Sequence, residues 1–127
     1  MRIFMVKAFS RFQRRERIDE LMLCDAIARA EKGLIDADLG GGLIKQRLAR
    51  KGQGKSGGFR TLIAIRSDRR AVFLYGFAKS DRGNIAPDKL ADLKFYAGHW
   101  LGLDDATVEV AVANGDLQEV FYGQATE

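Results

Sequence analysis

The segment KQRLARKGQGKSGGFR, residues 45–60, combines six cationic side chains with four glycines. No aspartate or glutamate occurs between Asp38 and Asp68, so no carboxylate nearby in the sequence neutralises this charge. Cations on two strands that flank a glycine-rich loop suit a polyanion such as a nucleic-acid backbone, although a solvated hairpin has the same pattern. The cations of the segment are Lys45, Arg47, Arg50, Lys51, Lys55 and Arg60.

This segment spans the first turn of a predicted three-stranded meander. Residues 43–50 alternate, so that Lys45 and Arg47 lie on one face of a strand and Gln46 lies on the other. Residues 59–66 and 71–77 continue as strands, and the last is apolar on both faces, which favours a central position. Short turns predict antiparallel pairing. We therefore expect Lys45, Arg47 and Arg60 to form a basic groove on one face, with helices on the other; a one-residue slip would reverse this.

Helical patterns precede and follow the meander. Residues 2–6 predict a short strand, and the spacing of Phe9 and Phe12 predicts a helix. Asp19 is a candidate N-cap for a second helix, and the two helices are expected to form an antiparallel hairpin. Pro87 and Asp104 mark the starts of two C-terminal helices, and residues 117–122 predict a last strand.

The first helix carries a cluster of arginines around its two phenylalanines. A solvated helix face is the simpler interpretation, and a secondary electrostatic contact to RNA is the alternative. The arginines are Arg11, Arg14, Arg15 and Arg17.

Composition excludes several classes of protein. The 127 residues predict a single domain, 1–127, with a net charge of +4 and 46% hydrophobic residues. Cys24 is the one cysteine, which excludes an internal disulfide and suits the cytoplasm, and we interpret it as a core residue. His99 is the one histidine, interpreted as a surface or packing residue, so no zinc site is expected. We expect no secretory signal and no membrane span.

Several stretches together resemble a known family. They are ADLGGGLIKQRLA at residues 37–49, KGQGKSGGFRTL at residues 51–62, FLYGFAKSDRGNI at residues 73–85, the helix with Asp88, Leu90 and Leu93, and LQEV at residues 117–120. The sequence resembles the HigB-like branch of the RelE/ParE toxin superfamily over residues 1–122. The resemblance implies an α+β, RelE-like fold: an N-terminal helical hairpin packed on a twisted antiparallel sheet, with C-terminal helices.

The resemblance also implies an activity. Typical members are toxins of type II toxin–antitoxin systems, and they cleave mRNA in the ribosomal A site without a metal or other cofactor. The 2′-OH of the RNA is the nucleophile. The implied partners are mRNA, the ribosome and a cognate antitoxin, in this branch usually a helix-turn-helix DNA-binding protein.

Individual cations acquire expected roles from this resemblance. Fixed guanidinium and ammonium groups stabilise the negative charge that develops on the phosphate during cleavage. Arg60 matches the arginine of the family's Gly-Phe-Arg motif. The expected catalytic residues are Arg60, Lys55, Lys79 and Arg82, and the expected RNA-binding residues are Lys45, Arg47, Arg50 and Lys51.

The sequence departs from the family pattern at the proton-transfer groups. Several RelE toxins have a tyrosine where this chain has the stretch from Asn84 to Pro87, and Ser80 replaces an arginine of some relatives. A lysine with a pKa lowered by neighbouring cations is then a candidate base. Two other functions stay open, a ParE-like poison of DNA gyrase and a catalytically inactive nucleic-acid-binding regulator. A structural alternative for Arg60 is pairing with Asp36 or Asp38.

Overall fold

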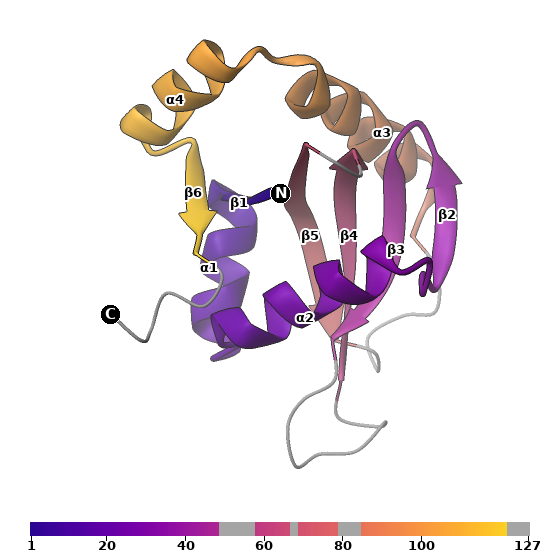
Figure 1. Ribbon diagram of the computed structural model, residues 1–127. Helices are drawn as coiled ribbons and strands as arrows, with labels where there is room; N and C mark the ends of the chain where they lie inside the picture. Colours follow the sequence, from indigo (N-terminus) through magenta and orange to yellow (C-terminus); the bar gives the residue numbers. More distant parts are fainter. Residues whose placement is uncertain (49–57, 67–68, 79–84, 122–127) are drawn as a thin grey trace.

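The structure is a computed structural model that describes residues 1–48, 58–66, 69–78 and 85–121. These residues form one six-stranded sheet with helices against both of its faces (Figure 1), so the fold is of the α+β class. In chain order the elements are β1 Arg2–Val6, α1 Lys7–Arg15, α2 Glu20–Glu31, β2 Ala37–Gly40, β3 Leu43–Leu48, β4 Phe59–Arg66, β5 Arg70–Ala78, α3 Pro87–Gly102, α4 Asp105–Asn114 and β6 Leu117–Val120.

The sheet is mixed, whereas the resemblance implied an antiparallel one. Its strand order is β2-β3-β4-β5-β1-β6, and β3, β4 and β5 form the predicted antiparallel meander. β1 pairs in parallel with β5, with Ile3 opposite Ala71, and antiparallel with β6. The first strand of the chain thus fills the place between β5 and β6, which makes β5 an interior strand as its apolar sequence predicted.

The two N-terminal helices cover one face of the sheet, but they do not form an antiparallel hairpin. Figure 1 shows α2 running across the direction of α1. Each helix packs on different strands: Phe9 of α1 stacks 5.0 Å from Phe73 of β5, while α2 packs on β3. Arg17, with φ of 56°, turns the chain between the helices. Contacts with the sheet therefore set their directions.

The second face of the sheet also carries helices, contrary to the expected helix-free groove. Leu93 and Ala97 of α3 and Val108 of α4 enclose an apolar cluster on this face, with Leu62 and Val72 from the sheet. These strand residues are fully buried, so water is excluded from this part of the face. The basic residues of β3 and β4 occupy the part of the face toward Leu48 and Phe59.

Polar side chains fix the helix boundaries as predicted. Asp19 accepts a hydrogen bond from the backbone N–H of Met22 at 3.0 Å, and Asp104 accepts one from Thr107 at 2.8 Å. Pro87 is the first residue of α3. No sequence pattern singled out Arg70, whose buried guanidinium donates to the carbonyl oxygens of Trp100 and Leu103 at 2.8 and 2.9 Å. Arg70 thereby holds the junction of α3 and α4 against β5.

Candidate nucleic-acid interface

Two arginines lie directly opposite each other on neighbouring strands. Arg47 of β3 pairs in register with Arg60 of β4, and Lys45 follows on the same face opposite Leu62. All three side chains are partly exposed. The predicted common face is confirmed. Like charges placed directly opposite each other destabilise a sheet, so this arrangement favours an anionic ligand between them.

Carboxylates do not balance these cations within the described part of the chain. None of the ion pairs among those residues includes Lys45, Arg47 or Arg60. Asp38 lies opposite Ile44, and the side chain of Ile44 points to the other face. The Oδ1 atom of Asp38 accepts a hydrogen bond from the N–H of Gly40 at 2.9 Å. The alternative in which Arg60 pairs with Asp36 or Asp38 is therefore not observed among the described residues.

The guanidinium of Arg60 contains an unsatisfied donor. Its Nη1 atom is buried and has no hydrogen-bond partner among the described residues. A buried polar group without a partner costs about 1–3 kcal/mol, and such groups are rare unless they have a functional role. An oxygen of a bound phosphate would satisfy this donor and neutralise part of the charge.

A buried amide fixes the direction in which the basic side chains point. Gln46 is 0% exposed, and its Nε2 donates to the carbonyl oxygens of Ala26 and Leu34, both at 2.9 Å. Its Oε1 accepts the N–H of Asp36 at 3.2 Å. Because Gln46 is bound on the α2 side of β3, Lys45 and Arg47 must point to the opposite face.

Two side-chain hydrogen bonds hold the backbone of β3 next to the Arg47–Arg60 pair. The Oγ1 of Thr61 donates to the carbonyl oxygen of Gln46 at 2.8 Å. Arg29 of α2 donates from Nη2 to the carbonyl oxygen of Arg47 at 2.6 Å. Fixed strands present cationic side chains in a defined geometry, as a binding site for a developing negative charge requires.

An aromatic side chain with a lysine beside its ring lies one row along the sheet from the Arg47–Arg60 pair. Tyr75 of β5 is opposite Leu62, and the Nζ of Lys89 lies 4.5 Å from the centre of its ring. Strict alternation along residues 71–77 predicts that Tyr75 shares the face of Phe73, which is wrong because a register shift follows Leu62. Neither residue was a candidate, and alternation of residue types contains no signal for such a shift. The position of Lys89 follows from how α3 packs.

A cleft extends from Tyr75 toward the N-terminus of α1. It has a volume of about 660 Å³, and Lys89, Tyr96 and Trp100 of α3 line one side. Lys7 and Arg11 line the other side, and Asp116 also contributes. Aromatic rings interspersed with cations are typical of surfaces that bind single-stranded nucleic acids.

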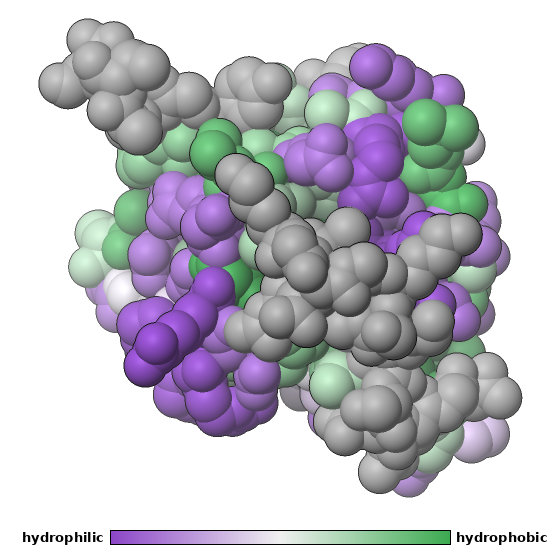
Figure 2. Space-filling model, turned by 90° about the horizontal axis from the view of Figure 1, so that it is seen from below, coloured by the Kyte–Doolittle hydropathy of each residue, from purple (hydrophilic) through white to green (hydrophobic). Residues whose placement is uncertain are grey.

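The other predicted site residues lie outside the described residues. In the sequence, residues 49–57 join β3 to β4, and residues 79–84 follow β5. The Arg47–Arg60 pair is one residue pair away from this end of the two strands. Figure 2 shows the molecule from this end, where hydrophilic side chains occupy much of the surface of the described residues. The roles expected for Arg50, Lys51, Lys55, Lys79 and Arg82 stay predictions.

Other reactive groups lie as the sequence predicted. Cys24 is buried in the core under α2, and burial, with a smaller effect of Glu20, raises the pKa of its thiol. His99 is exposed on α3, with its ring 4.8 Å from that of Trp100.

In the described part of the chain, acidic residues, histidine and cysteine form no cluster of three that could hold a metal ion. No described helix is long and apolar enough to cross a membrane.

Comparison with known proteins identifies the family to which the chain belongs. Residues 1–120 match the family described as the RelE toxin of the RelE/RelB toxin–antitoxin system. The chain therefore belongs to the RelE toxin family, whose members have a cognate antitoxin as partner. No curated protein sequence matches the chain significantly.

Proposed function

We propose that this toxin is an endoribonuclease that cleaves mRNA on the ribosome and so stops translation. We further propose that it belongs to the HigB-like branch of the superfamily. Its antitoxin would then be a small helix-turn-helix DNA-binding protein. The proposal rests on membership of the RelE family together with one structural observation, the uncompensated Arg47–Arg60 pair.

The proposed reaction is an internal transfer of the phosphate that needs no metal. The 2′-oxygen attacks the adjacent phosphorus and loses its proton to a base, for which a lysine of residues 49–57 is the candidate. The bond to the 5′-oxygen breaks, and that oxygen takes up a proton. Charge accumulates on the non-bridging oxygens in the transition state, where Arg60 would stabilise it.

Arginine suits this role better than lysine. Its planar guanidinium can hold two phosphate oxygens at once, and β4 fixes the backbone of Arg60 by pairing on both sides. The free Nη1 donor of Arg60 supports such a contact. Lys45 and Arg47 would position the neighbouring phosphates of the strand.

Inducing the protein in bacterial cells and mapping RNA ends tests this proposal. We expect rapid loss of protein synthesis and new mRNA ends inside reading frames, and co-expression of the antitoxin should restore growth. Intact mRNA together with broken DNA would instead indicate a gyrase poison. Normal growth at every level of expression would indicate an inactive regulator.

A further inference from the structure

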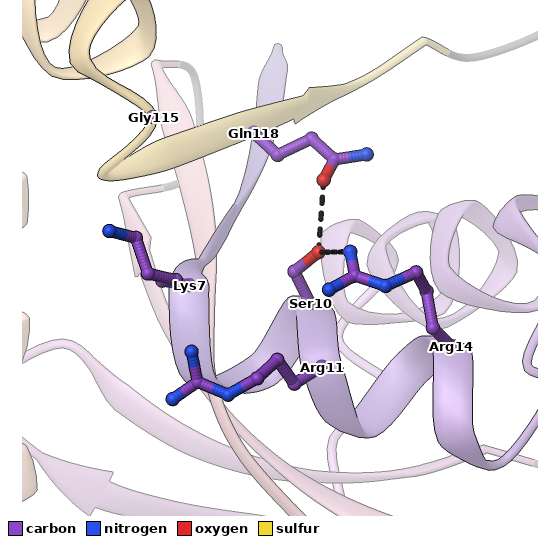
Figure 3. A pocket seen from close by; sticks show the side chains of 6 residues that line it. All are labelled: Lys7, Ser10, Arg11, Arg14, Gly115 and Gln118. Atoms are coloured by element: carbon purple, nitrogen blue, oxygen red, sulfur yellow. Dashed lines mark hydrogen bonds between the residues drawn. The ribbon is translucent and has the colours of Figure 1, made fainter.

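A second cationic pocket lies away from the Arg47–Arg60 pair, between α1 and β6. It has a volume of about 280 Å³. Figure 3 shows its lining. The residues that line it are Lys7, Ser10, Arg11, Arg14, Gly115 and Gln118.

A hydrogen-bond chain at the base of this pocket fixes the orientation of its polar groups. Ser10 is only 4% exposed. Its Oγ accepts from Nη1 of Arg14 at 2.8 Å, so its proton must go to the Oε1 of Gln118, which lies 2.9 Å away (Figure 3). Within the described part of the chain, this leaves the Nε2 of Gln118 with both of its protons available for a ligand.

The described charged side chains that line the pocket are all positive. Lys7, Arg11 and Arg14 are exposed, and none of the described carboxylates lines the pocket. None of the ion pairs in the described part of the chain involves these three residues. The pocket thus presents ammonium, guanidinium and amide donors together, which is the donor set that binds the oxygens of a phosphate.

The pocket is connected to the surface around Arg47 and Arg60 through the cleft beside Tyr75. Lys7 and Arg11 line both this pocket and the larger cleft that contains Tyr75 and Lys89. Tyr75 in turn shares a sheet row with Lys45. Cationic and aromatic side chains therefore continue from the Arg47–Arg60 pair to the pocket, as a path for a single strand would require.

We propose that this pocket binds a phosphate group of an RNA backbone and so acts as a second anchor for RNA. The inference rests on the function proposed above, because it assigns the ligand to RNA. The phosphate could belong to the mRNA or to the ribosomal RNA. A carboxylate of the antitoxin is a competing ligand that the experiment must separate.

Two pocket variants and a matched control test the proposal. Arg14→Gln removes one cation. Gln118→Glu keeps an acceptor for Ser10 but adds a carboxylate that should pair with Arg14 and repel a phosphate. Arg15→Gln is the control, because Arg15 lies on the same helix with 68% of its side chain exposed and does not line the pocket. Thermal melts establish that all three are folded.

The first measurement is an NMR titration with inorganic phosphate. The side-chain amide of Gln118 should shift in the unmodified protein and in Arg15→Gln. In Arg14→Gln the shift should require more phosphate. No shift in the unmodified protein would overturn the proposal, whatever its activity on RNA.

The second measurement compares salt dependence of binding to a 2′-O-methyl RNA oligonucleotide, which cannot be cleaved, and to ribosomes without mRNA. Losing one phosphate contact should reduce the slope of log affinity against log salt by about 0.7. A reduced slope with the oligonucleotide identifies the mRNA as the ligand, and one seen only with ribosomes identifies ribosomal RNA.

Slopes equal to that of Arg15→Gln in both assays would overturn the proposal. If the unmodified protein still cleaves mRNA in that case, only the pocket assignment fails. If the pocket variants instead weaken only the complex with the antitoxin, the pocket belongs to that partner. If the unmodified protein binds neither RNA nor ribosomes, the proposed function fails together with the RNA assignment.

Discussion

Arg60 has two structural features that oppose folding, as we expect for a residue with the role proposed above. Arg60 lies directly opposite Arg47 in the strand register, and its Nη1 is buried without an acceptor among the described residues. Both features oppose folding. The methylene groups of an arginine also bury apolar surface in general, which offsets part of this effect.

Replacing Arg60 should therefore separate activity from stability. We expect Arg60→Ala to reduce the cleavage rate by at least about 10²–10³ and Arg60→Lys to cause a large loss as well, because lysine lacks the planar fork. The free energy of unfolding should stay within about 1 kcal/mol of the unmodified protein. Arg66→Ala is the control, since Arg66 is exposed on the same strand. Full activity of Arg60→Ala, or failure of this variant to fold, would contradict the assignment.

Gln46 has the opposite character, since its buried side chain stabilises the fold. Gln46→Leu would leave the carbonyl oxygens of Ala26 and Leu34 and the N–H of Asp36 without their partner. We expect a loss of about 2–4 kcal/mol in urea unfolding, against about 1 kcal/mol for Thr61→Val, which removes one hydrogen bond. Equal losses in the two variants would show that the amide of Gln46 is not the main connection between α2 and β3.

At the scale of elements, α1 is held against β5 by a close contact at Gly76. A Cβ at this position would clash with the ring of Phe12. Gly76→Ala should therefore destabilise the protein by about 1–3 kcal/mol. Gly98→Ala on α3 meets no atom within 4 Å and should stabilise by about 0.5–1 kcal/mol.

Chemical denaturation of both glycine variants checks this prediction. Phe12→Leu should rescue part of the stability of Gly76→Ala, because it removes the ring edge that clashes. Equal effects of the two alanines would indicate that α1 can shift freely on β5.

The start of α4 should depend on pH through its cap. Hydrogen bonds from the side chain and the backbone N–H of Thr107 lower the pKa of Asp104 below its usual 3.8. A lowered pKa in the folded state means that the cap contributes fully above the unfolded pKa and loses its contribution as the pH falls through the folded value. Asp104→Ser retains a cap that does not titrate.

Comparing the stability of Asp104→Ser with that of the unmodified protein across acidic pH isolates this effect. The difference between the two should be constant above about pH 5 and should shift in favour of the serine variant below pH 4. A difference that does not change with pH would show that the carboxylate of Asp104 does not cap α4 in its charged form.

How far the sequence predicts this structure depends on whether an interaction is local. Alternation in β3 and β4 correctly placed Arg47 and Arg60 on one face, and Asp19 and Asp104 marked helix starts, because these signals depend on nearby residues. The register shift after Leu62, which turns Tyr75 toward the basic face, depends on packing between strands. The parallel pairing of β1 with β5 and the buried Arg70 depend on contacts between distant segments.

At the scale of the whole molecule, the sheet separates two tasks. One face, under α1 and α2, holds the larger aromatic core. The other face combines the apolar support of α3 and α4 with the basic surface, so binding a polyanion need not disturb the core. If the proposed function is correct, a cognate antitoxin has to cover this basic surface or prevent access to the ribosome.

The most direct test of the central claim uses purified ribosomes stalled on a defined mRNA with an empty A site. Primer extension would map the RNA ends that appear after the protein is added. We expect a cut within the A-site codon that depends on the ribosome, is slowed by about 10²–10³ or more in Arg60→Ala, and is unchanged in Arg66→Ala. Intact mRNA at protein concentrations that saturate the ribosome, or equal cleavage by Arg60→Ala, would contradict the account.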